Sequence, residues 1–381
     1  MNKVISGPTK PRKCYYFCPV IEISHIFRWD LDKTYLKTDF DTVRDLVRVA
    51  RMTAEERENI PGSAALLREM RAGRSDKNQN LIYFISGSPR QLRKVIEKKF
   101  ALDGFEPDGF VLKPSLSMLM RGRLRGLRNQ VPYKLSALLS GRGDSPIGTH
   151  ETLLGDDAES DALIYSLYAD ILSGLIDRDF LFKFLKKTKA YKDQLAAIEY
   201  QMDAIIHEET VKRIIINLDR NTAPAEFMDY FPRVVPVHNH LQTAIVLCLD
   251  QSVSIDAVRD VAYEMLWKFK YKPDFLVHSA EDIFRRQRLY QPQKNYDKLL
   301  EELKACPPPN PPEKASKQAI AQIETTLGFI QRLVERLEYL RTRPLPRTTS
   351  RAAPSRNYFE LLDAEEKIRE LRKKVQNMKP R

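Results

Sequence analysis

The sequence predicts an α/β protein built on a parallel sheet, because three observations agree. Short apolar runs of strand length alternate with charged segments of helical periodicity over the first half of the chain. Each apolar run ends in a turn, as expected where strands and helices alternate. The polar motifs follow apolar runs directly, and the carboxyl ends of parallel strands are where ligands bind in such sheets. The sequence therefore predicts a single site at one edge of the sheet.

Composition limits the class of protein. The 381 residues are 43% hydrophobic and 30% charged, which suits one large domain or two with a proper core. The formal net charge of +12 favours anionic partners, namely phosphorylated substrates, acidic membrane surfaces or nucleic acid. The four cysteines show no disulfide framework and no zinc pattern. No apolar run reaches the roughly 18 residues of a transmembrane helix, and residues 1–13 do not read as a signal peptide, so a cytoplasmic protein is expected.

Four strands are predicted in the first half of the chain. The first covers residues 20–27, an apolar run with one polar break, and a charged helical region at 42–70 follows it. Pro61-Gly62 interrupts that region. The remaining elements are strands at 81–85, 109–112 and 152–154, and helices at 90–99, from Pro132 onward and at 163–171.

The pattern weakens beyond Asp179. It predicts a charged helix at 179–209, strands at 211–218 and 242–249 with a weaker one at 234–235, and a helix at 255–267. These elements can extend the same sheet. We therefore assign residues 1–19 to a tail and 20–290 to one catalytic domain, with the motifs at 20–172 and a less certain extension at 173–290.

The C-terminal part is predicted to be helical. A proline-rich linker at 306–313 precedes a long amphipathic helix at 314–341, and a second linker at 342–356 precedes a charged helix at 357–378. The apolar residues of the helix at 314–341 are spaced three or four residues apart. This spacing suits either a coiled coil between two chains, which would make a homo-oligomer, or a helix packed on the catalytic domain. The apolar positions that define this spacing are Ile320, Ile323, Leu327, Ile330, Val334, Leu337 and Leu340.

The segment after the first strand carries the most chemistry. Asp30 and Asp32 stand two residues apart, which places both carboxylates on one side of an extended backbone, and Thr34 adds a hydroxyl. Like charges this close need a cation or a raised pKa. One interpretation is a Mg²⁺-assisted aspartyl nucleophile with a second aspartate as acid and base. The other is a polar turn in which an aspartate caps a helix.

The order of four motifs resembles the haloacid dehalogenase-like (HAD) phosphotransferase superfamily, and most closely the catalytic domain of the actin-patch-associated phosphatidate phosphatase family. The resemblance covers residues 20–172. It implies a Rossmannoid parallel sheet with helices on both faces and a Mg²⁺-dependent phosphatase. The residues that carry it are Trp29-Asp30-Leu31-Asp32-Lys33-Thr34 through Lys37-Thr38, Phe84-Ile85-Ser86-Gly87-Ser88-Pro89-Arg90-Gln91-Leu92, Tyr133-Lys134-Leu135 and Leu154-Gly155-Asp156-Asp157-Ala158-Glu159-Ser160-Asp161.

The resemblance implies a role for each acidic residue. Asp30 would attack phosphorus, and Asp32 would protonate the leaving oxygen, later deprotonate water and lend its main-chain carbonyl to the metal. Asp156 would complete the Mg²⁺ site, and Asp157 would share or replace its role. Thr34 belongs to the same catalytic motif.

The remaining motif residues would handle the phosphoryl group. Ser86 with Gly87 would hydrogen-bond a phosphoryl oxygen, Lys134 would neutralise the group, and Asp161 would orient the site through Lys134. Each of these residues alone also has a non-catalytic interpretation. Ser86 could be a turn residue, Lys134 could be an exposed lysine on the protein surface, and Asp161 could be a solvated charge. Their joint order favours the catalytic interpretation.

A basic segment at 118–128 lies between the second and third motifs. Its Arg121, Arg123 and Arg125 suit a second phosphate, a lipid headgroup surface or a nucleic-acid backbone, and the alternative is a solvated loop. The expected function is hydrolysis of a phosphomonoester, phosphatidate or a related phospholipid, with peripheral membrane contact. The alternatives are an interaction protein on the same fold, or a phosphatase of nucleotides or nucleic-acid ends.

Overall fold

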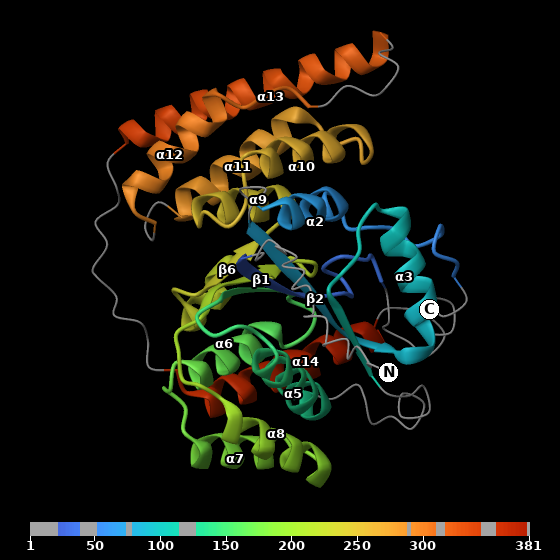
Figure 1. Cartoon of the computed structure of the whole chain (residues 1–381), viewed down its shortest axis with the longest axis vertical. Coiled ribbons are helices and arrows are strands. Elements are labelled where there is room, and N and C mark those ends of the chain that lie inside the picture. Colours follow the sequence, from blue (N-terminus) through green and yellow to red (C-terminus); the bar gives the residue numbers. More distant parts are fainter. Residues whose placement is uncertain are drawn as a thin grey trace, which may run out of the picture.

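The structure, a computed structural model, describes residues 22–38, 52–73, 78–113, 127–287, 291–309, 317–343 and 356–378. Its centre is a six-stranded sheet in the order β3-β2-β1-β4-β5-β6, and every neighbouring pair is parallel (Figure 1). The predicted parallel α/β sheet is confirmed. The strands are β1 (Glu22–Asp30), β2 (Asn78–Pro89), β3 (Gly109–Lys113), β4 (His150–Asp156), β5 (Val211–Asn217) and β6 (Val234–Val237).

Helices cover both faces of the sheet, each over its own apolar cluster (Figure 1). Successive side chains of β1 point to opposite faces, so Trp29 stacks on Phe84 in one cluster while Arg28 pairs with Glu151 on the other side. The helices of the first face are α2 (Ser63–Ala72), α3 (Arg93–Leu102), α9 (His240–Leu249), α10 (Asp256–Trp267), α11 (Pro273–Gln287), α12 (Gln293–Lys304) and α13 (Lys317–Thr342). Those of the second face are α5 (Leu127–Gly143), α6 (Asp161–Leu172), α7 (Arg178–Lys187), α8 (Lys192–Ala204) and α14 (Tyr358–Met378).

Four predicted elements differ from the structure. Among the described residues of the helical region predicted at 42–70, residues 52–62 form no helix, and α2 begins only after Gly62, which has a left-handed φ of 85°. Residues 242–249, predicted as a strand, lie in helix α9, whose residues are buried all round and therefore show no amphipathic period. Helix α5 begins at Leu127 and contains Pro132 in its interior, so that proline does not open the helix. The charged helix predicted at 179–209 is two helices, α7 and α8, separated by a turn in which Lys189 has a φ of 56°.

The long helix after the first linker packs on the body of the protein. Helix α13 lies against α10, α11 and α12, and its Phe329, Leu333 and Leu337 belong to the main core. Ile320 and Leu327, two members of the predicted stripe, are exposed. The buried face is thus rotated from the predicted one, and it packs on the body of the protein, as one of the two alternatives expected.

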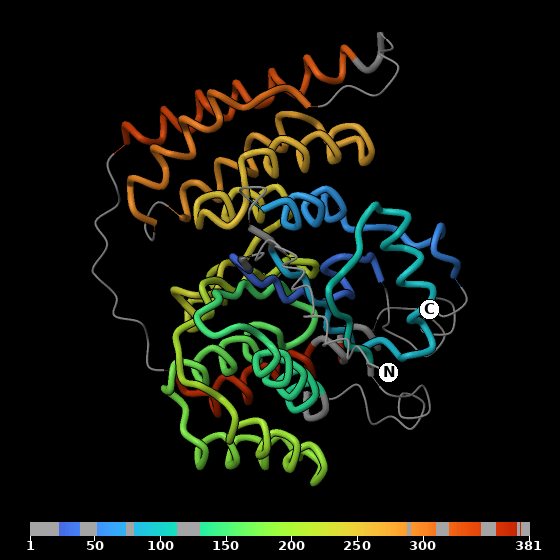
Figure 2. Tube along the Cα trace, in the orientation of Figure 1, coloured from blue at the N-terminus to red at the C-terminus, as the bar shows by residue number. Residues whose placement is uncertain are grey.

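The last helix returns to the opposite side of the sheet. Figure 2 shows α13 in orange at one end of the molecule and α14 in red on the other side of the strands, with α7 and α8 beyond it. Tyr358 and Leu362 of α14 are buried in the cluster of α5, α6 and α7. Among the described helices, none has the length together with the apolar composition that a bilayer-spanning segment requires.

A buried histidine links α9 to the chain after β1 and predicts a pH-dependent stability. His240 Nε2 donates to the carbonyl oxygen of Thr34 at 2.8 Å. Burial lowers the pKa of His240 to about 4, and the hydrogen bond to Thr34 opposes this shift. The unfolded chain therefore binds the proton more readily, so stability falls as the pH drops from about 6.5 to about 4, by about 3 kcal/mol in total.

The variant His240→Gln should lack this part of the pH dependence. Urea unfolding at pH 7 and pH 4.5 measures it, as the difference between the two free energies of unfolding. His278→Gln, at an exposed histidine, is the matched control and should keep the wild-type difference. An unchanged difference in His240→Gln would contradict the assignment.

Candidate active site

Three neighbouring strands end in polar side chains that lie at one edge of the sheet. Asp30 is the last residue of β1, Asp156 is the last of β4, and Ser86 lies in the last part of β2. β1 pairs with both β2 and β4, so the three ends lie side by side. The carboxyl edge of a parallel sheet is the usual place for a ligand.

Lys134 stands at the centre of this edge. Its Nζ lies 2.9 Å from Asp30 Oδ1, 2.5 Å from Asp161 Oδ1 and 2.8 Å from Glu159 Oε2, and its side chain is only 1% exposed. Burial alone would lower the pKa of Lys134, but the carboxylates of Asp161, Asp30 and Glu159 outweigh it and raise the pKa well above its usual value. Lys134 is therefore a buried ammonium group, not a surface lysine.

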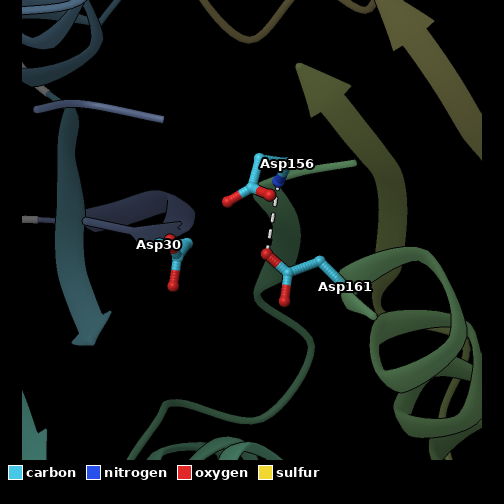
Figure 3. A group of neighbouring side chains, drawn as sticks. All are labelled: Asp30, Asp156 and Asp161. Atoms are coloured by element: carbon cyan, nitrogen blue, oxygen red, sulfur yellow. Dashed lines mark hydrogen bonds between the residues drawn. The ribbon is translucent and has the colours of Figure 1, made fainter. Parts of the chain in front are cut away.

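Three buried carboxylates gather beside Lys134. One oxygen each of Asp30, Asp156 and Asp161 lies within 4.8 Å of the others, and Figure 3 shows how they converge. Asp161 Oδ2 accepts the Asp156 amide at 3.2 Å. Gly155 leaves room for this approach, because a Cβ at Gly155 would stand 2.6 Å from that of Asp161.

The same group can hold a metal ion. Asp30 Oδ2 and Asp156 Oδ2 are buried and accept no hydrogen bond from any described residue. Burial, together with the repulsion between neighbouring carboxylates, raises the pKa of both groups well above the usual range. Unpartnered buried oxygens of this kind are expected where a cation binds.

The second aspartate of the first motif faces a different set of groups. Asp32 Oδ2 accepts from Ser86 Oγ at 2.9 Å and from Ser88 Oγ at 3.1 Å, and its Oδ1 accepts from Thr38 Oγ1 at 3.1 Å. Burial raises the pKa of Asp32, while these three hydroxyls oppose the shift. A left-handed φ of 61° at Lys33 makes the tight turn that follows Asp32. Thr34 Oγ1 is buried without a hydrogen bond from the described residues.

Asp157 has partners of its own. Its two oxygens accept the amides of Arg220 and Thr222 at 2.8 and 3.1 Å, which ties the loop after β5 to the end of β4. Asp156, in contrast, lies with Asp30 in the group described above. The sequence alone does not distinguish Asp156 from Asp157 as a metal ligand, whereas in the structure the two carboxylates have different neighbours.

Residues 29–178 match the family model of the catalytic domain of phosphatidate phosphatase APP1. This segment is similar to that family. The match contains every described residue of the carboxyl edge named above except Arg220 and Thr222, and it makes the domain that of a hydrolase. The comparisons with curated proteins and with solved structures gave no match.

Three residues of the quoted motifs contact the APP1-type site, although the sequence assigns them no role. Glu159 contacts Lys134 from inside the fourth motif, where its acidic character was a usable signal. Ser88 and Thr38 hydrogen-bond Asp32, and Ser88 also donates its amide to Ser86 Oγ at 2.9 Å across Gly87. The predicted phosphate contacts Arg121, Arg123 and Arg125 lie outside the described residues.

The C-terminal helix also reaches the APP1-type domain. A small cavity of about 140 Å³ is lined by Asp156 and Glu159 on one side and by Leu361 and Glu365 of α14 on another. Burial raises the pKa of Glu365 to about 7, although hydrogen bonds from Ser160 and Tyr230 oppose the shift. No local pattern in the sequence places α14 here, because it follows the fourth motif by nearly 200 residues.

Proposed function

We propose that the chain is a Mg²⁺-dependent phosphatase that hydrolyses phosphatidate or a related phospholipid through an aspartyl-phosphate on Asp30. One observation supports the proposal: Asp30 and Asp161 both pair with the buried ammonium of Lys134, and all three residues lie in the segment that resembles a phosphatase domain. Asp30, Asp156 and the main-chain carbonyl of Asp32 would hold Mg²⁺. When bound, the ion withdraws charge from the phosphoryl oxygens.

Asp30 is the proposed nucleophile. Lys134 holds its Oδ1, and of the two carboxylate oxygens one would attack phosphorus while the other remains available to the ion. A new bond forms between this oxygen and phosphorus as the bond to the leaving oxygen breaks. Lys134 also compensates negative charge on the phosphoryl group, and Asp161 keeps the ammonium in position.

Asp32 is the proposed acid and base. Its raised pKa favours the protonated form that the first step needs, and three hydroxyls fix its orientation. In the first step Asp32 gives its proton to the leaving oxygen. In the second it takes a proton from water, whose oxygen bonds to phosphorus as the bond between phosphorus and the Asp30 oxygen breaks. Inorganic phosphate and free Asp30 are the products.

Phosphate release from several substrates tests the proposal. Purified protein should release phosphate from phosphatidate in mixed micelles and from an aryl phosphate, and a chelator should abolish both activities until Mg²⁺ is restored. Release only from oligonucleotide ends or nucleotides would favour the nucleic-acid alternative. A folded protein that releases phosphate from none of them would favour an interaction protein on a phosphatase fold.

Asp156→Ala and Asp157→Ala should differ in their need for Mg²⁺. Removing Asp156 takes away a proposed ligand, so the Mg²⁺ concentration for half-maximal activity should rise by roughly 10- to 100-fold. Asp157→Ala should instead lower stability, because the main-chain amides of Arg220 and Thr222 lose their acceptor. Titrating the activity of both variants against Mg²⁺ measures this concentration. A larger rise in Asp157→Ala than in Asp156→Ala would make Asp157 the ligand.

A further inference from the structure

A large cavity lies on the second face of the sheet, between the strands and the helices α5 and α8. Its volume is about 720 Å³, within the range of about 300–1,000 Å³ typical of small-molecule sites. Neither the family match nor the proposed mechanism assigns it a role. The lining includes Tyr83 and Ile85 of β2, Val111 of β3, Tyr133 and Ala137 of α5, and Ala197 of α8.

The cavity adjoins the phosphoryl site through one residue. Tyr133 lines it, and the Tyr133 hydroxyl donates to the carbonyl oxygen of Ser86 at 3.0 Å. The next residue in α5 is Lys134, which contacts Asp30. Ile85, also in the lining, directly precedes Ser86 in β2. The strand end and the helix turn that bear the phosphoryl-binding groups therefore also border the cavity.

The chemistry of the lining suits an uncharged ligand. Its one arginine, Arg28, is already paired with Glu151 at 2.9 Å and lies over the Tyr83 ring, and Asp144 and Asp193 would repel a second phosphate. Val111 is 42% exposed and Tyr191 41%, so apolar side chains at the cavity also face solvent. A hydrocarbon chain can enter past such side chains without desolvating a charge.

We propose that this cavity binds the hydrocarbon chain of a phosphate ester whose phosphoryl group lies at Asp30 and Lys134. The proposal rests on the proposed function and specifies its substrate class as lipid phosphates. Each methylene buried in the cavity should strengthen binding by up to about fourfold. The gain should appear in KM and level off once the cavity is full, because the chain is remote from the reacting bond.

The test uses n-alkyl phosphates from ethyl to decyl, kept below micelle-forming concentrations. In the full-length protein, kcat/KM should rise severalfold with each added pair of methylenes, through KM with little change in kcat. Ala197→Trp, which places an indole in the cavity, should flatten this rise and leave ethyl phosphate hydrolysis unchanged. Ala196→Trp is the matched control: the neighbouring residue on α8 is also exposed but does not line the cavity, so the rise should persist.

A binding measurement separates this proposal from the proposed function. Calorimetric titration with ethylphosphonate and decylphosphonate measures binding without turnover. Decylphosphonate should bind to the wild type and to Ala196→Trp at least 10-fold more tightly than it binds to Ala197→Trp. Equal affinities of the two ligands, or an equal preference in both variants, would overturn the cavity assignment. Absence of phosphate release from every alkyl phosphate, despite that binding preference, would overturn the proposed function alone.

Discussion

Asp30→Asn should lower kcat by at least about 10⁴-fold, because the amide keeps the shape of the side chain but has no nucleophilic carboxylate oxygen. The fold should survive, since Lys134 retains Asp161 and Glu159 as ion-pair partners. Phosphate release and circular dichroism on the same sample measure both effects. Retention of most activity in the folded variant would exclude the aspartyl-phosphate.

Asp103→Asn is the matched control for this variant. Asp103 is also a buried carboxylate paired with a lysine, with Lys99 Nζ at 2.8 Å, but it caps the end of α3 and is not one of the carboxylates that gather beside Lys134. Losing that pair should reduce stability by several kcal/mol and leave kcat nearly unchanged. A comparable loss of kcat in both variants would mean that any disturbance of the buried ion pairs inactivates the protein.

A chain that ends at Cys306 should fail to fold into a stable protein. The linker pattern in the sequence favours a separable helix, but the structure buries Phe329, Leu333 and Leu337 of α13 in the main core, together with Ile330 and Leu340. Each such side chain contributes about 1.5–3 kcal/mol, so the loss is on the order of 10 kcal/mol. The whole stability of a domain is about 5–15 kcal/mol. Soluble yield and thermal unfolding measure the outcome.

Two leucines of α13 provide the control for the truncation. Leu333→Ala removes a fully buried side chain and should cost about 2–5 kcal/mol of unfolding free energy. Leu327→Ala, on the predicted stripe but exposed, should cost less than about 1 kcal/mol. If the stripe paired between chains instead, Leu327→Ala would be the more harmful change and would lower the mass measured by light scattering.

Much of the site could be predicted because its chemistry is local in the sequence. Asp30 and Asp156 each follow a short apolar run, and parallel strands bring such ends to one edge. The motif order then identified the family segment that the comparison confirmed. The equivalence of Asp156 and Asp157 could not be resolved in this way, because their partners Asp30 and Arg220 are distant in the chain.

The helical layers were less predictable, for a reason that α9 and α13 share. Residues 242–249 are apolar on every side, and a short buried run has the same composition in a strand and in a helix. In α13 the periodicity was correct, but Phe329 and Leu333 are buried while Leu327 is exposed. Only the packing against α10, α11 and α12 selects that face.

The sequence by itself determined the parallel sheet, the carboxyl edge with its aspartates, and the resemblance of residues 29–178 to a phosphatase family. These features follow from the periodicity and spacing of residues that are close in the sequence, because the local backbone geometry sets the direction in which each side chain points. Three features could be seen only in the tertiary structure. They are the contact of three carboxylates with Lys134, the position of α14 beside Glu159, and the cavity that Tyr133 lines. Each of these depends on contacts between segments tens to hundreds of residues apart, and such contacts leave no pattern in either segment taken alone.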